Sequence, residues 1–256
     1  MTAVQIALFL LCVALATGAQ NLTGFAFTLI LLGLAGLMEL APLADLANVA
    51  TVLALANALV ALRGSGRMLD LPALRQITLG SAIGIAVGVL LLAWLGSNVV
   101  VVLRLLLGLT VIVCAIIVLR GNTALRERSS AASFRFWGLV SGLLSGLFSA
   151  GGPPLVYQLY RQPMDLKTVR DTLVATLAVA SLMRLALVVP SGQFSANALK
   201  LCLLAAPLVF ALSWWLERHP PGWSRSAVLK LVCALLLLTG AGLTVPALLQ
   251  IARMGS

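Results

Sequence analysis

A long apolar stretch in the second half of the chain is interrupted by residues that cannot continue a helix. Residues 138–166 read GLVSGLLSGLFSAGGPPLVYQLYRQPMDL. A helix here would stop at residues 150–154, because two prolines lack backbone donors and two glycines leave the backbone unrestrained. Freed N–H and C=O groups within an apolar run are costly in lipid unless protein or water surrounds them. We therefore expect this break to lie inside the protein and to form part of a functional site.

The composition of the chain is that of a membrane protein. Of its 256 residues, 61% are hydrophobic and only 9% are charged, and the mean hydropathy is +1.11. Apolar segments of membrane-spanning length cover almost the whole sequence. The sequence therefore predicts an all-α, multi-pass integral membrane protein of the inner (cytoplasmic) cell membrane, with the lipid bilayer as its partner.

The net charge of +10 indicates orientation in the membrane and not a nucleic-acid partner. The basic residues cluster in loops between apolar runs, at 63–75, 120–135, 161–170 and 217–230. Loops near 39–45, 96–98 and 191–199 lack this excess. Cytoplasmic loops are the basic ones in membrane proteins. The segment between Arg135 and Arg161 has such a loop at both ends, which predicts a re-entrant hairpin.

The two halves of the chain share a layout. A shift of 128 residues takes Gly18 to Gly146 and Gly24 to Gly152, so each half opens with a polar or glycine-rich break. Paired broken segments are typical of transporters built from internal repeats. A hairpin plus three spans is an odd number of crossings, so we expect inverted repeats with both termini outside. The alternative has eight full spans and a cytoplasmic N-terminus.

In the inverted arrangement the first hairpin enters from the outside and turns at residues 20–24. The repeats are expected at residues 1–122 and 134–256, joined by a cytoplasmic linker at 123–133. Small residues at helical spacing predict where helices approach closely. These residues are Gly80, Gly84 and Gly88 in one span, and Gly138, Ser141, Gly142, Ser145 and Gly146 in the broken segment.

From residue 142 to residue 185 the sequence resembles a known family. The run GLLSGLFSAGGPPLVYQLY, followed by TVRDT at 168–172 and SLMR at 181–184, is similar to the second half of the sulfite exporter TauE/SafE family of membrane transporters. The run GAQNLTGFAF at 18–27 resembles that family's N-terminal motif. The resemblance covers the whole chain and implies export of small anions, typically sulfite, sulfonates, or other sulfur-containing or carboxylate compounds.

The broken helices themselves favour an anionic ligand, because free N–H groups and positive helix ends would lie at mid-membrane depth. If the two breaks meet, neutral side-chain donors would surround these amides. The simpler alternative for the glycines is that they only permit close packing of helices. The alternative for Tyr157 is that its ring anchors the helix at the membrane interface. The substrate-binding candidates at the breaks are Gln20, Asn21, Thr23, Gly24, Ser149, Gly151, Gly152, Pro153 and Tyr157.

Two arginines lie within predicted spans, where an ionised side chain is expensive. Arg184, which belongs to the family-like SLMR motif, is the stronger candidate for an anion ligand or gate, and Arg104 is the weaker one. The alternative for both is that the side chain reaches to the membrane interface.

Three further residues are candidates for gating or for lining the substrate's path. Arg170 lies beside Asp171, so a structural ion pair is equally compatible with it. Asn48 and Asn57 are nine positions apart and face opposite sides of a helix, so at most one of them can line a shared site. Hydrogen bonds between helices are the alternative for both.

Other functional classes fit poorly. His219 is the only histidine, and the four cysteines lie singly in apolar segments, so we expect no metal, no cofactor and no enzymatic activity. The sequence predicts a secondary transporter or exporter of sulfite, of sulfonates such as sulfoacetate or taurine-like compounds, or of other small organic anions. A non-transporting membrane assembly module and an anion channel are the alternatives. Open questions are the substrate, the direction, the coupling ion (a proton among the options) and the oligomeric state (a homodimer among them).

Overall fold

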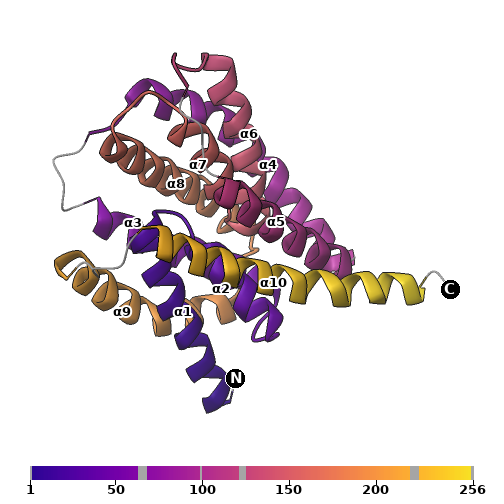
Figure 1. Ribbon diagram of the computed structural model, residues 1–256. Helices are drawn as coiled ribbons and strands as arrows, with labels where there is room; N and C mark the ends of the chain where they lie inside the picture. Colours follow the sequence, from indigo (N-terminus) through magenta and orange to yellow (C-terminus); the bar gives the residue numbers. More distant parts are fainter. Residues whose placement is uncertain (1, 63–67, 99, 121–124, 220–224, 255–256) are drawn as a thin grey trace.

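The computed structural model describes residues 2–62, 68–98, 100–120, 125–219 and 225–254 (Figure 1). This part of the chain is all helical. The first five helices are α1 (Ala3–Thr23), α2 (Phe27–Leu37), α3 (Leu43–Ala61), α4 (Leu71–Asn98) and α5 (Val100–Arg120). The next five are α6 (Ala131–Phe148), α7 (Gly152–Tyr160), α8 (Leu166–Val188), α9 (Ala196–Arg218) and α10 (Arg225–Met254).

Seven of the described helices are long and apolar enough to cross a membrane, namely α1, α3, α4, α6, α8, α9 and α10. The helix α2 and the Val101–Ile116 part of α5 are apolar but shorter. This composition and helix content confirm an all-α, multi-pass membrane protein. The two shortest helices, α2 and α7, each follow a break in the chain.

The segment from α6 to α7 is a hairpin. Gln162, just after α7, donates from Nε2 to Ser129 Oγ at 2.9 Å and accepts from the Ser129 N–H at 3.0 Å, just before α6. One turn further in, Ser133 Oγ donates to Gln158 Oε1 at 3.4 Å. The chain therefore returns to the end of the bundle at which it entered, as the charge pattern predicts. The membrane side to which it opens stays a prediction.

The break in this hairpin lies earlier than expected. The helix α6 ends at Phe148, and Ser149 adopts a left-handed conformation with φ +57°. The expectation that the prolines stop the helix is wrong, since Pro153 and Pro154 lie in the first turn of α7. Proline is well suited there, because the first turn of a helix does not use its N–H groups for internal bonds. A serine at positive φ is strained, which is typical of functional sites.

The break in the first half also differs from the expectation. The helix α1 continues through the polar residues 18–23 and ends only at Gly24, where φ is +87°. The polar side chains do not disrupt the helix, because they bond back to its carbonyls. Thr17 Oγ1 donates to Val13 O, Asn21 Nδ2 to Thr17 O and Thr23 Oγ1 to Ala19 O, at 2.7–2.9 Å.

Corresponding helices of the two halves start at offsets close to the expected 128 residues. The offset is 128 residues from Ala3 of α1 to Ala131 of α6, and 125 residues from Phe27 of α2 to Gly152 of α7 and from Leu71 of α4 to Ala196 of α9. The packing follows the same correspondence. The helix α6 packs on α4 as α1 packs on α9, and α8 packs on α4 as α3 packs on α9. The pairs α3–α8 and α5–α10 join corresponding helices.

Hydrogen bonds and ion pairs sort the loops into two groups. One group, here called the basic end, joins Arg128 to Asp70 by an ion pair at 2.8 Å, and Leu125 N to Arg161 O at 2.8 Å. The described parts of the basic loops at 63–75, 120–135 and 161–170 lie in this group.

The other group, here called the Glu39 end, pairs Glu39 with Arg104 at 2.7 Å and Asp45 with Ser195 at 2.7 Å. The helix α8 runs from one end to the other. Its Thr172 Oγ1 accepts from Asp70 N at the basic end, and Gln193, just after it, bonds to Asn48 near the Glu39 end.

The glycine stripes bring α4 and α6 into backbone contact, as predicted, and the two helices lie side by side in Figure 1. A Cβ added at Gly84 would lie 2.3 Å from Leu139 O, and one added at Gly142 would lie 2.4 Å from Ser81 O. Gly88 and Gly146 face each other across the same contact. Any larger residue at these positions would push the two helices apart.

We expect Gly84→Ala to destabilise the protein by at least about 2 kcal/mol, because the added methyl group meets backbone that cannot move aside. Gly18→Ala is the matched control, since a Cβ at Gly18 in α1 meets nothing within 4 Å. Its effect should be within about 1 kcal/mol of wild type. Thermal unfolding of the purified protein in detergent measures both changes. Equal stability of the two variants would contradict the close contact of α4 with α6.

Candidate functional site

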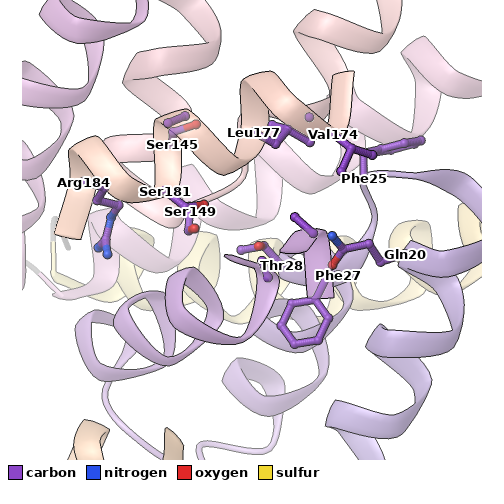
Figure 2. Close-up of a pocket in the computed structure, with 14 residues that line it drawn as sticks. Gln20, Phe25, Phe27, Thr28, Ser145, Ser149, Val174, Leu177, Ser181 and Arg184 are labelled. Carbon is purple, nitrogen blue, oxygen red and sulfur yellow. The ribbon is translucent and has the colours of Figure 1, made fainter. Parts of the chain in front are cut away.

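The two breaks meet in the interior and enclose a cavity. Gly152, the first residue of α7, lies so close to Phe25 that an added Cβ would be 2.8 Å from the Phe25 Cβ. The cavity is small in this conformation, since the centres of water-sized spheres can occupy only about 20 Å³ of it. Figure 2 shows Arg184 at one side of it and Gln20 at the other. Its lining residues are Gln20, Phe25, Phe27, Thr28, Ala54, Ala58, Ser145, Ser149, Gly152, Val174, Leu177, Ala180, Ser181 and Arg184.

Arg184 is the charged residue of this lining, and its side chain is completely buried. Its Nη1 donates to Asn48 Oδ1 at 2.9 Å and to Thr51 Oγ1 at 2.8 Å, both on α3. Its Nε donates to the Gly146 carbonyl of α6 at 3.1 Å. The third nitrogen, Nη2, is buried and has no hydrogen-bond partner. The guanidinium therefore has its position set by three neutral groups and keeps the two N–H groups of Nη2 free.

The break in α6 supplies one of these partners. In a continuing helix the Gly146 carbonyl would accept from the Ala150 N–H, but Ala150 bonds to Leu144 O instead. The carbonyl that is released lies at the negative end of the α6 dipole, where a cation is stabilised. The Gly146 carbonyl freed by the helix break thus gains a donor, and Arg184 Nε gains an acceptor.

Arg184 has no acidic counterpart among the residues that the structure describes. The two ion pairs found among the described residues are Arg104–Glu39 and Arg128–Asp70, and neither includes Arg184. The desolvation of a buried ionised group that has no counter-charge costs on the order of several kcal/mol of folding free energy. Because the free Nη2 belongs to a residue that lines the cavity, an anion bound there would supply both the missing charge and the missing acceptor.

Neutral donors surround the same space. No hydrogen bond within the described part of the chain uses the hydroxyl groups of Thr28, Ser145, Ser149 or Ser181, all of which line the cavity. In Figure 2, Ser149 and Ser181 lie between Arg184 and the centre of the cavity. Hydroxyl groups can donate to an anion without adding charge, so they suit a ligand that must later be released.

Two helix N-termini also meet the cavity. The helices α2 and α7 begin at Phe27 and Gly152, and neither has a side chain that caps its first N–H groups. Uncapped N–H groups and the positive end of the helix dipole favour an anion. From the cavity α2 runs to the Glu39 end and α7 runs to the basic end.

The structure brings four of the expected substrate-binding residues together in this cavity, namely Gln20, Ser149, Gly152 and Arg184. The remaining residues of the breaks shape the backbone and do not line the space. Gly24 provides the left-handed turn, and Thr23 closes it by accepting from Phe25 N at 3.5 Å. The carbonyl of Gly151 accepts from Ser141, and Pro153 is buried in the first turn of α7.

Tyr157 and Arg170 are not among the residues that line the cavity, and the role of Arg170 in gating or entry stays a prediction. Tyr157 packs against the ring of Trp137 and accepts a hydrogen bond from Arg161, because α7 turns this side toward the start of α6. Arg170 is exposed and reaches the Asn21 carbonyl at 3.5 Å. Arg104 pairs with Glu39 at the bundle surface. Arg184 does not reach to the membrane interface, since it is fully buried.

Asn48 and Asn57 separate as their spacing predicts. Asn48 contacts Arg184, next to the cavity. Asn57 Oδ1 accepts from Ser213 Oγ at 2.6 Å and from Asn21 Nδ2 at 3.2 Å, in a polar cluster between α1, α3 and α9. The expectation that Asn21 binds substrate does not match this placement, because its amide belongs to this cluster.

The sequence reasoning missed several residues of the lining. Ser181 and Leu177 precede Arg184 by one and two helical turns, so the 3.6-residue period of a helix could have placed them on its face. Ser145 was assigned to helix packing alone. Thr28 and the two phenylalanines lie immediately after the first break and could not be assigned without knowing how the breaks approach each other.

Known proteins match this chain along most of its length. The sequence model of the family described as sulfite exporter TauE/SafE matches residues 9–244. A protein of Cupriavidus necator named "Probable sulfite/organosulfonate exporter TauE" is 33% identical over 229 residues, which cover 90% of this chain and 90% of that protein. No solved structure matches. The chain therefore belongs to the sulfite exporter TauE/SafE family and is a multi-pass membrane transporter.

Proposed function

We propose that this protein exports sulfite and small organosulfonates from the cytoplasm across the inner membrane, as a secondary transporter. The family and the name of the relative supply this substrate class. The observation that carries the proposal is the free Nη2 of the buried, unpaired Arg184 beside the cavity. A sulfonate group offers three oxygens, so it can accept from Arg184, from Ser149 and Ser181, and from the amides of the helix starts at the same time.

The two halves alternate the exposure of this cavity between the two sides of the membrane. The opposite courses of α2 and α7, away from a shared cavity, support inverted repeats, as does the sorting of the basic loops to one end. Val174, Leu177, Ser181 and Arg184 extend the cavity along α8, and Asn48 and Gln193 close the Arg184 side toward the Glu39 end.

The first experiment is a thermal-shift screen of the purified protein with matched pairs of anions. Ethanesulfonate is compared with propionate, and sulfite, taurine and sulfoacetate are included. A ligand at 100 times its Kd stabilises the folded state by about 2.7 kcal/mol. We expect the sulfonates and sulfite to raise the unfolding temperature and propionate to have a smaller effect. A response to carboxylates alone would discard the sulfur assignment, and no response together with no flux would contradict transport.

Arg184→Gln should weaken ethanesulfonate binding at least about tenfold, because it removes the charge and the free donor that meet the anion. Arg104→Gln is the matched control. Its guanidinium is paired with Glu39 and is partly exposed, with 37% of the side-chain surface accessible, so the Kd should stay within about twofold of wild type. Ligand titrations followed by thermal shift give both values. A larger effect at Arg104 would place the anion site elsewhere.

Gly152→Leu should abolish transport while the protein still inserts in the membrane, because the side chain would fill the contact of Gly152 with Phe25. Gly18→Leu serves as the control, since that position faces open space. Flux of labelled taurine or sulfite into inverted membrane vesicles, normalised to the membrane-inserted amount, is the measurement. Wild-type flux in the Gly152 variant would mean that the substrate does not pass between the two breaks.

A further inference from the structure

The side chain that holds Arg184 in place is a carboxamide where a buried arginine usually finds a carboxylate. Asn48 is 2% exposed and accepts from Arg184 Nη1 through Oδ1 at 2.9 Å. Its own Nδ2 donates to the Gln193 carbonyl at 2.8 Å, which fixes which side of the amide faces the guanidinium. An aspartate has the same shape, and arginine and carboxylate groups in protein interiors are normally paired.

The remaining partners of this guanidinium are also neutral. Thr51 provides a hydroxyl oxygen and Gly146 a backbone carbonyl. These three groups satisfy the geometry of Nε and Nη1 and leave the positive charge without compensation. They therefore separate two roles that a carboxylate would combine, namely holding the side chain and neutralising it.

We infer that Asn48 determines the specificity of the site for anions by positioning Arg184 without neutralising it, so that the transported anion is the counter-charge of this arginine. The inference rests on the proposed function and extends it to a residue of α3 that does not line the cavity. A carboxylate at this position would occupy the charge permanently. The anion would then meet a neutral pair. The second carboxylate oxygen would face the Gln193 carbonyl, which now accepts from Asn48 Nδ2, and this contact would offset part of the stability gained from the ion pair.

Asn57 provides a matched comparison on the same helix. It is the same residue type and is 1% exposed, and its hydrogen-bond partners Asn21 and Ser213 are neutral. Arg170 reaches this cluster only at the Asn21 backbone carbonyl, at 3.5 Å, so a carboxylate at Asn57 would be buried among neutral hydrogen-bond partners, whereas a carboxylate at Asn48 would face a cation directly. The same substitution should therefore destabilise the protein more at Asn57 than at Asn48.

The test compares Asn48→Asp, Asn48→Ser and Asn57→Asp, by ligand-free thermal unfolding and by titration with ethanesulfonate and sulfite. We expect Asn48→Asp to weaken anion binding at least about tenfold, and to lower the unfolding temperature of the ligand-free protein less than Asn57→Asp does. Asn48→Ser should weaken anion binding less than Asn48→Asp does, because it removes one of the three partners that position Arg184 but adds no charge. Asn57→Asp should lower the unfolding temperature.

The ranking of the two Asn48 variants distinguishes charge from shape. If Asn48 acted through its shape alone, Asn48→Asp would bind the anion better than Asn48→Ser, because aspartate has the shape of asparagine. We expect the opposite, namely that Asn48→Ser binds the anion better than Asn48→Asp. Wild-type affinity in Asn48→Asp, or loss of binding in Asn48→Ser as complete as in Arg184→Gln, would overturn the inference. If Asn48→Asp does not fold, the comparison of Asn48→Ser with Arg184→Gln still decides the question. Absence of any anion response in the wild-type protein would overturn the proposed function itself.

Discussion

Backbone N–H and C=O groups find no hydrogen-bond partners in lipid. The architecture of this protein therefore depends on where its helices break and free such groups. The helices α1 and α6 are terminated by left-handed residues, Gly24 and Ser149, within apolar surroundings. The carbonyls and N–H groups released there must be enclosed by the protein. The other helices pack around these two breaks, and the close contact of α4 with α6 keeps the second break in place.

The second break and the buried arginine depend on each other. The end of α6 releases the Gly146 carbonyl, and Arg184 uses it together with Asn48 and Thr51 of the other half of the chain. The arginine thereby links three helices, α3, α6 and α8, at one side of the cavity. A charge that is held by neutral partners and adjoins an open space has a clear physical use, because a passing anion can compensate it and leave again.

The sequence indicated the breaks, the glycine contacts and the buried arginine because each has a strong local signature. Paired glycines and prolines indicate a break even though the prolines here begin the following helix, and small residues at four-residue spacing allow backbones to meet. An arginine in a span is too expensive to be incidental. The same reasoning failed where side chains bond locally. Polar residues 18–23 suggested a break, but threonine and asparagine can return hydrogen bonds to their own helix, so α1 continues to Gly24.

Residue order alone determined that this chain is helical, that it crosses a membrane several times, and that its charged loops fall into two classes. These properties follow from composition and period, which are local. Only the tertiary structure decided that Ser181 and Thr28 share a cavity with Gln20 while Tyr157 and Asn21 do not. That outcome depends on how α2, α6 and α8 approach one another, and side chains distant in sequence become neighbours only through such packing. The neutrality of the Arg184 partners likewise appears only when α3 is placed beside α8.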